Sequence, residues 1–272
     1  MSARSGTGPR TLFLCGLGAL CAWTLVPIYL IALGAIGGPN LISRWPKPFW
    51  PEGSSLAALR YFLDIAGVWS ATLYSIEAAV LCMALSILLG IPAGYALARF
   101  AFRGAVAFRL MVLMTRAFPV AILALPLTVG FIRLGLYDSP VGVGVMHTTL
   151  ALPFAVLVSA SLFQAIPHEL EEAAWVFGCS RVTAFLRVVL PLALPGIAAT
   201  AIFAFVISWN EVFAASVLTV RHRTLTAYLL SVLAESPLHV QFAGGFLLIV
   251  PSVLFIFLVR RHLFAMWGIA SK

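Results

Sequence analysis

The chain carries very little charge. Only 10% of its 272 residues are Asp, Glu, Lys or Arg, whereas 62% are hydrophobic and the mean hydropathy is +1.07. A soluble globular domain has about a quarter of its residues charged, because its surface must be solvated. The composition therefore excludes that class and indicates an integral membrane protein.

Several chemical signatures are also missing. The four cysteines show no CxxC spacing, so neither a metal site nor a disulfide framework is expected. No GxxxxGK[ST] phosphate loop occurs, and no Ser-His-Asp arrangement or carboxylate pair in a polar context suggests hydrolysis. We therefore do not expect an enzyme, and energy for uphill transport would have to come from a partner.

The net charge of +8 would suggest a nucleic-acid partner in a soluble protein. Here the basic residues lie in short gaps between apolar runs, where Lys and Arg orient membrane proteins and contact anionic lipid. We expect membrane lipid as a partner and no nucleic acid.

Six stretches are long and apolar enough to span a membrane, for which about 20 residues are needed. They predict an all-α integral membrane fold with six transmembrane helices in a single domain over residues 1–272. The first stretch is too long for a signal-peptide core and is expected to be retained. Prolines within the spans predict kinks and not breaks, because neighbouring helices can satisfy the freed carbonyls. The predicted spans are Leu12–Ile36, Ser70–Ala98, Leu110–Phe131, Val141–Ala165, Gly196–Val217 and Phe242–Leu263.

The distribution of Lys and Arg predicts the orientation. A cytoplasmic N-terminus assigns ten basic residues to the inside and six to the outside, with Arg116 left within a span. Both termini and the loop 166–195 are then cytoplasmic, as in a multi-pass protein of a bacterial-type plasma membrane. The proline- and tryptophan-rich segment 37–69 is predicted to be an irregular external segment near the lipid headgroups.

The loop 166–195 is the most informative part of the sequence. Pro167 suits a first helical turn, and Glu169, Glu171 and Glu172 follow where the helix dipole favours negative charge. Apolar residues recur at helical spacing up to Gly178, which is placed to end the helix in a left-handed conformation. A first helix of roughly ten residues is therefore predicted.

A second helix is predicted directly afterwards. Ser180 can cap it and Pro191 is expected to end it, with an apolar face that includes Phe185 and Val189. The pair forms a rigid helix–turn–helix with one apolar and one charged face. The small side chains of Ala173 and Ala174 would allow a partner to approach closely.

This pattern resembles a known signature. Glu172-Ala173-Ala174, then Gly178, then Val188-Val189-Leu190-Pro191 is similar to the EAA motif of permeases from ATP-binding-cassette (ABC) importers. The resemblance implies the type I importer (MetI-like) fold, in which this loop is a coupling helix held in a cleft of a separate ATPase. The residues that it assigns to ATPase docking are Glu169, Glu171, Glu172, Ala173, Ala174, Phe177, Gly178, Leu190 and Pro191.

Three further stretches resemble the MalG-type subfamily of carbohydrate importers, namely Gly94–Gly104, Ile166–Glu172 and Ala201–Glu211. The resemblance implies ABC ATPase subunits, a second, MalF-like permease and an extracytoplasmic substrate-binding protein as partners. ATP and Mg would be bound by the ATPase, with no cofactor in this chain. The chain departs from the family at Phe177 and Cys179, where Asp-Gly-Ala is common around the glycine, and at Arg116, where Gln is common.

Four polar residues lie within or beside predicted spans, where such side chains are costly and often functional. Glu77, Asn210 and Glu211 could line a translocation path and bind sugar hydroxyls, with Arg116 nearer the inner gate. The alternative is that they fix helix packing through interhelical hydrogen bonds. His147 has no carboxylate at helical spacing and is interpreted as a packing residue.

Other interpretations stay open at this point. The external cluster Arg221-His222-Arg223 could dock a binding protein or could be a solvated charge run, and Trp175 could fill the ATPase cleft or anchor the membrane surface. The solute could be a polyamine or a phosphate ester in place of a sugar. An ion-coupled carrier using Glu77 and Glu211, or a membrane structural or sensor protein, are alternatives of a different class.

Overall fold

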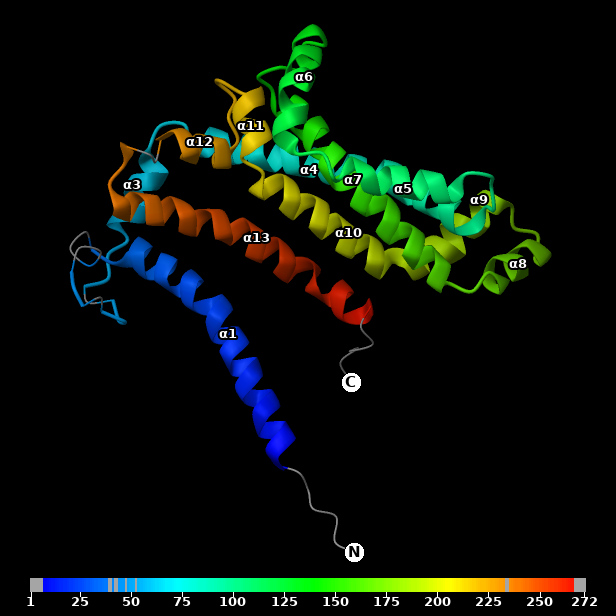
Figure 1. The fold of residues 1–272 in the computed structure, drawn as a ribbon, viewed down its shortest axis with the longest axis horizontal. Coiled ribbons are helices and arrows are strands. Elements are labelled where there is room, and N and C mark those ends of the chain that lie inside the picture. The colour runs from blue at the N-terminus through cyan, green and yellow to red at the C-terminus, as the bar shows by residue number, and fades with distance from the viewer. Residues whose placement is uncertain are drawn as a thin grey trace, which may run out of the picture. The chain divides into compact units, whose positions relative to one another are not determined.

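The computed structural model describes the backbone of residues 7–38, 41, 44–46, 48–51, 53–232 and 235–266 (Figure 1). Side chains are described over the same ranges, except for residues 7–10, 232 and 258–266. Of the basic residues that predict the orientation, Arg4, Lys47 and Lys272 lie outside the described residues. All the described regular structure is helical.

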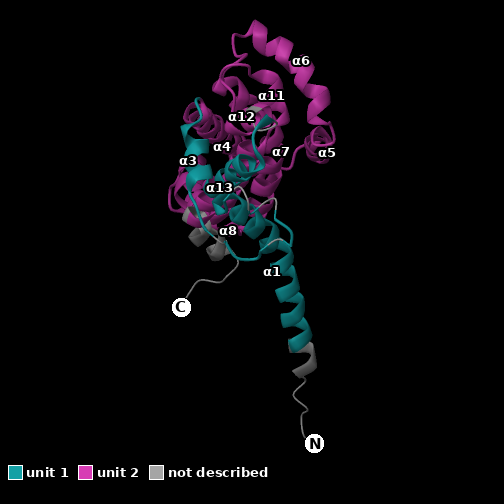
Figure 2. Ribbon diagram, turned by 90° about the vertical axis from the view of Figure 1, so that its left-hand side faces the viewer, with its two compact units in different colours: residues 1–66, 232–250 teal, residues 67–231, 251–272 magenta. Residues whose placement is uncertain are grey.

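The chain divides into two compact units, coloured separately in Figure 2. The first comprises residues 1–66 and 232–250, and the second comprises residues 67–231 and 251–272.

The first unit contains α1 (Thr7–Ile36), α3 (Ala57–Asp64) and the first half of α13 (Leu238–Met266). Phe242 of α13 packs so closely on α1 that a Cβ at Gly34 would lie 2.6 Å from its ring. The described part of segment 37–69, which was predicted to be irregular, thus includes the short helix α3, whose buried face is formed by Ala58 and Phe62. Trp45 and Trp50 of the same segment are exposed.

The core of the second unit is a bundle of α4 (Val68–Arg99), α7 (Pro140–Ala165) and α10 (Leu190–Asn210). Small residues let α4 and α7 approach closely, as membrane helices often do. A Cβ at Gly94 would lie 2.5 Å from the Cβ of Ser159, so this crossing requires glycine. Apolar clusters follow the bundle along its length, with Met146 near one end and Phe163 near the other.

The third predicted span, Leu110–Phe131, is wrong as a continuous helix. It forms α5 (Ala105–Thr115) and α6 (Val120–Arg133), which meet at 93°. The cause is Pro119, which disfavours helical geometry in the residue before it and adopts an extended conformation itself. The proline therefore breaks the helix where a kink was predicted.

The fifth predicted span, Gly196–Val217, is also wrong in its limits. One continuous apolar helical run extends from Arg181 to Asn210, formed by α9 (Arg181–Ala184), a π-helical turn (Phe185–Val189) and α10. Pro191 does not end the second helix of the loop, because it lies in the first turn of α10, where a proline is tolerated. The run ends at Asn210, and α11 (Phe213–Leu218) and α12 (Leu225–Val232) follow.

Five described helices are long and apolar enough to cross a membrane, and α5 with α6 makes a sixth if the bent pair is counted as one span. The prediction of an all-helical membrane fold is therefore confirmed, with one span broken.

Candidate functional site

The predicted first helix of the loop is α8 (Glu169–Val176), with Glu169, Glu171 and Glu172 in its first turn. Its end is a Schellman motif: Cys179 N–H donates to the Ala174 carbonyl and Gly178 N–H donates to the Trp175 carbonyl, both at 2.9 Å. Gly178 has φ 87°, in the left-handed region. The predicted role of Gly178 in ending the helix is confirmed.

One face of α8 exposes large apolar side chains. Phe177 is 87% exposed and Val176 is 85% exposed, with Leu170 and Ala173 also on the surface. Glu169 and Glu172 flank them and are exposed as well. Such an apolar patch with a charged border is typical of a surface that a partner covers.

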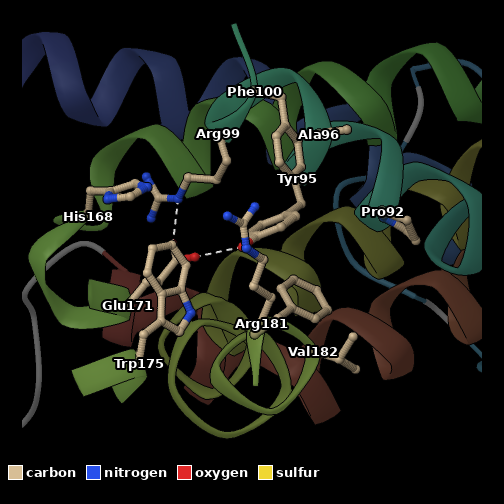
Figure 3. A pocket seen from close by; sticks show the side chains of 11 residues that line it. Pro92, Tyr95, Ala96, Arg99, Phe100, His168, Glu171, Trp175, Arg181 and Val182 are labelled. Carbon is tan, nitrogen blue, oxygen red and sulfur yellow. Dashed lines mark hydrogen bonds and ion pairs between the residues drawn. The ribbon is translucent and has the colours of Figure 1, made fainter. Parts of the chain in front are cut away.

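The other face of α8 carries a buried carboxylate. Glu171 is only 1% exposed, and its Oε1 accepts a charge-assisted hydrogen bond from Arg99 Nε at 2.5 Å. The Tyr95 hydroxyl donates to Oε2 at 2.6 Å (Figure 3). Sequence analysis placed Glu171 among the residues that dock a partner, whereas its carboxylate is turned inward onto α4.

These contacts fasten α8 to the last turns of α4. Arg99 also donates from Nη2 to the Ile166 carbonyl at 2.9 Å, ahead of α8. The Tyr95 ring packs on Phe163 of α7 and Phe185 of the π-helical turn, with centroids 5.4 and 4.6 Å away. We call Tyr95, Arg99 and Glu171 the inner corner, because the distribution of Lys and Arg predicts that this end of the bundle faces the cytoplasm.

The second helix of the loop begins as predicted, because the Ser180 side chain accepts a hydrogen bond from Thr183 N–H at 3.2 Å. Val189 is buried in the bundle and Leu190 packs beside it, while Pro191 is exposed. Leu190 therefore serves the core in this structure.

The four predicted path residues are not gathered into one site. Glu77 and Arg116 are exposed, and no hydrogen bond or ion pair joins either side chain to the described residues. Asn210 is exposed and donates from Nδ2 to the Val206 carbonyl at 2.9 Å, one turn earlier in α10. A role in the path stays a prediction for these three.

Glu211 is the fourth, and it belongs to a packing network. Its Oε2 lies 3.0 Å from Nε2 of the fully buried His147, whose Nδ1 lies 2.8 Å from Ser208 Oγ. The Glu211 carboxylate also accepts hydrogen bonds from the backbone N–H groups of Ala214 and Ala215 at the start of α11. The network thus explains why α10 ends at Asn210, and it gives His147 the carboxylate partner that helical spacing did not reveal.

Ser208, His147 and Glu211 are the residue types of a hydrolase triad, but the two ring nitrogens are reversed, because Nδ1 faces the serine and Nε2 faces the carboxylate. Ser208 is only 4% exposed and His147 is fully buried. A substrate carbonyl cannot reach Ser208 Oγ in this conformation, and the three side chains join α7 to the end of α10. A role of Glu211 in the path stays a prediction.

Asp138, between α6 and α7, organises the opposite end of the second unit. Its Oδ1 accepts hydrogen bonds from the backbone N–H groups of Val220, Arg221 and His222 at 2.8, 2.9 and 3.0 Å. Burial alone would raise the pKa of Asp138, but these amides and the nearby His222 outweigh it and lower the pKa. We call Asp138 with residues 220–222 the outer corner.

Sequence reasoning missed Tyr95, Arg99 and Asp138 as site residues. Arg99 carried one usable signal, since a basic residue at the end of a span commonly faces the charged membrane surface. Asp138 carried a weaker one, because it is an isolated acid in a short turn beside a span. Their partners are more than 60 residues away in each case, and no local pattern indicates such pairs.

Residues 86–266 match the family model of the binding-protein-dependent transport system inner membrane component. The chain belongs to this family. The match includes α7, α8, α10, the inner corner and the second half of α4, so the predicted resemblance to ABC importer permeases is confirmed.

Individual relatives agree with this assignment. The permease is 37% identical over 217 residues to a putative ABC transporter permease protein of Streptomyces antibioticus, covering 78% of this chain and 95% of the relative. It is 32% identical over 205 residues to the trehalose transport system permease protein of Mycobacterium tuberculosis, covering 72% and 74%.

A solved structure supports the fold. A chain of a bacterial ABC transporter involved in the import of the acidic polysaccharide alginate superposes with a TM-score of 0.75 at 21% identity, covering 97% of this chain and 99% of that one. The family match and the relatives thus show an ABC transporter permease, and the solved structure shows that its fold is that of an ABC importer subunit.

Proposed function

We propose that the permease imports a sugar or oligosaccharide, driven by ATP hydrolysis in a partner subunit that binds the exposed face of α8. In this proposal it works with a second permease and an extracytoplasmic substrate-binding protein in a bacterial inner membrane. ATP and Mg would be held by the ATPase alone.

The observation that carries the proposal is the two-sided construction of α8. Its outer face offers Val176 and Phe177 to a partner, while Glu171 on its inner face is buried against Arg99. A helix that only connected two spans would need neither the exposed apolar patch nor a buried ion pair. A helix that transmits motion needs both, because a partner must bind one face and the other face must be joined to the helices that move.

Coupling then follows from the contacts of the inner corner. Closure of the ATPase pair would displace α8, and the ion pair between Glu171 and Arg99 would pass that displacement to the end of α4. Since α4 packs along α7 and α10, the bundle would shift as a body and switch the cavity between its two facing states. Glu77, Arg116 and Asn210 are the candidates for groups that the sugar meets on its way.

The substrate class is supported by the relatives and by the MalG-type stretches. The trehalose permease of Mycobacterium tuberculosis is similar over about three quarters of its length, and the alginate importer shares the fold. Both carry carbohydrates according to their names, and the stretch Trp209-Asn210-Glu211 lies within the matched region.

Deletion of residues 172–178 separates this proposal from an ion-coupled carrier. The proposal expects loss of ATPase association on co-purification and loss of uptake in cells. A deletion variant that keeps uptake responsive to a proton or sodium gradient would show that the chain is a secondary transporter.

A second experiment tests the solute. The permease is co-purified with its ATPase and binding protein, reconstituted in lipid, and assayed for ATP hydrolysis with a panel of sugars. The proposal expects stimulation by at least one carbohydrate. Stimulation only by a polyamine or a phosphate ester would move the assignment to that solute class.

A further inference from the structure

A cleft of about 550 Å³ lies beside the inner corner, between the last turns of α4, α8 and the start of α9 (Figure 3). Arg99 is the last residue of one apolar helical run and Arg181 is the first residue of another. The cleft therefore lies at the depth where hydrocarbon gives way to lipid headgroups, on the side predicted to be cytoplasmic.

The cleft holds one positive charge, that of Arg181, with which no carboxylate in the described part of the chain forms an ion pair. The charge of Arg99 is neutralised by Glu171, which lies 2.5 Å away. Among the described residues no carboxylate lies within ion-pair distance of Arg181, whose guanidinium is 5.4 Å from the ring centroid of Trp175. Figure 3 shows Arg181 reaching from α9 toward Tyr95 and the Glu171 carboxylate. An anion placed here would meet a guanidinium that is already oriented by an aromatic ring.

A second donor points to the same kind of ligand. The indole Nε1 of Trp175 is shielded from solvent and has no hydrogen-bond partner among the described residues. A buried N–H without an acceptor costs free energy, so an acceptor in the cleft would relieve that cost. Trp175 and Arg181 together offer donors of the kind that phosphate oxygens accept.

The rest of the cleft is apolar. Phe185 and Val182 line it from the second helix and Pro92 lines it from α4. A small hydrophilic anion would leave these surfaces uncovered, whereas a hydrocarbon chain would cover them. The cleft thus combines two hydrogen-bond donors for an anion with an apolar surface for an acyl chain.

We propose that this cleft binds one anionic phospholipid, with its phosphate on Arg181 and Trp175 and an acyl chain along Val182 and Phe185. The cytoplasmic leaflet is the one that presents anionic headgroups. The lipid would contact α8 through Trp175 and α4 through Pro92. Its binding would therefore stiffen the same joint that the ion pair between Glu171 and Arg99 fastens.

Native mass spectrometry of the full chain in detergent tests the site. Phosphatidylglycerol and phosphatidylcholine with identical acyl chains are added separately, and retained lipid is counted per protein. We expect one retained phosphatidylglycerol and weaker retention of phosphatidylcholine. Arg181→Gln should weaken retention of phosphatidylglycerol about tenfold, the effect of losing one charge-assisted hydrogen bond. Arg181→Lys should keep most of it, because it preserves the charge.

Two matched variants act as controls. Arg187→Gln removes an exposed charge from the same helical run but does not line the cleft, and it should leave lipid retention unchanged. Trp175→Phe keeps the ring and removes the donor, so it should weaken retention by a smaller factor, about threefold. Size-exclusion profiles and circular dichroism establish that each variant is folded.

Three results would overturn the proposal. Equal retention by Arg181→Gln and Arg187→Gln would show that the lipid does not use the cleft. Displacement of the lipid by an equal concentration of inorganic phosphate would assign the site to a free anion. Loss of the lipid from wild-type permease on binding of the ATPase would assign the cleft to the protein partner.

Discussion

The inner and outer corners of the second unit both rest on a carboxylate, but they use it differently. At the inner corner, Glu171 is buried and contacts side chains of another helix, at 2.5 Å from Arg99 and 2.6 Å from Tyr95. At the outer corner, Asp138 is part-exposed and contacts three consecutive backbone N–H groups. One carboxylate joins two helices, and the other shapes a loop.

The difference has a mechanical meaning. A side-chain ion pair between α8 and α4 transmits a displacement from one helix to the other while leaving the exposed face of α8 unchanged. Backbone hydrogen bonds from residues 220–222 to Asp138 instead fix the shape of a loop, including the direction of Arg221. In the proposed mechanism the inner corner would therefore move, while the outer corner would present a defined surface.

The largest effect is expected from Arg99→Leu. It leaves the Glu171 carboxylate buried without its cation, which costs about 3–5 kcal/mol in comparable ion pairs. We expect a marked loss of thermal stability in detergent, together with uncoupling of ATP hydrolysis from uptake. Arg103→Leu removes an exposed charge four residues later and should change neither. Equal effects of the two variants would mean that the ion pair of the inner corner has no particular importance for stability or for coupling.

Asp138→Asn should have an intermediate effect on stability. The amide keeps one acceptor oxygen but loses the charge that strengthens three hydrogen bonds, so we expect about 1–2 kcal/mol of destabilisation at neutral pH. Thermal unfolding measured as a function of pH tests in which direction the stabilisation by Asp138 changes. Because the pKa of Asp138 is lowered in the folded state, its contribution is present above the ordinary Asp pKa and is lost as pH falls through the folded value.

The difference in melting temperature between wild type and Asp138→Asn should therefore shrink as pH falls below about 4. A difference that grows on acidification would contradict the account. The Arg99→Leu variant differs from Asp138→Asn, because it also removes the ion pair that joins α4 and α8.

Glu172→Gln separates docking from folding. Glu172 is exposed, and among the described residues its carboxylate pairs with His168 alone, one turn earlier. Its loss should therefore change stability by less than about 0.5 kcal/mol. Affinity for the ATPase, measured by co-purification over a range of salt concentrations, should nevertheless fall. Unchanged affinity at low salt would remove Glu172 from the contact surface.

Arg116→Gln is expected to have the smallest effect on stability, because its side chain is exposed and makes no ion pair with the described residues. Assembly with the ATPase should be retained and the KM for uptake should change. Uptake with unaltered KM and kcat would show that Arg116 is not part of the path.

The sequence was informative where the signals are local. The glycine that ends α8 and the cap at Ser180 depend on residues within a few positions of each other, and the structure confirms both. The EAA pattern is equally local, and the family match confirms the resemblance that it carries. The helix limits around Pro119 and Pro191 were wrong for a related reason. A proline breaks a helix, bends it or sits in its first turn according to the tertiary contacts around it.

The inner corner could not be predicted from spacing. Glu171 has the same local environment in the sequence as Glu172, yet one side chain is buried and the other is exposed. The choice is made by Tyr95 and Arg99, more than 70 residues earlier. The same holds for His147 and Glu211, which meet only because α7 packs on α10.

The central claim is that an ATPase binds the exposed face of α8. A photo-reactive amino acid in place of Phe177, which is 87% exposed, tests it most directly in a complex that hydrolyses ATP. The account predicts a crosslink to the ATPase whose yield changes when ATP is added, and no such crosslink from Val220 of the outer corner. A transport-competent complex without any ATPase crosslink at position 177 would contradict it.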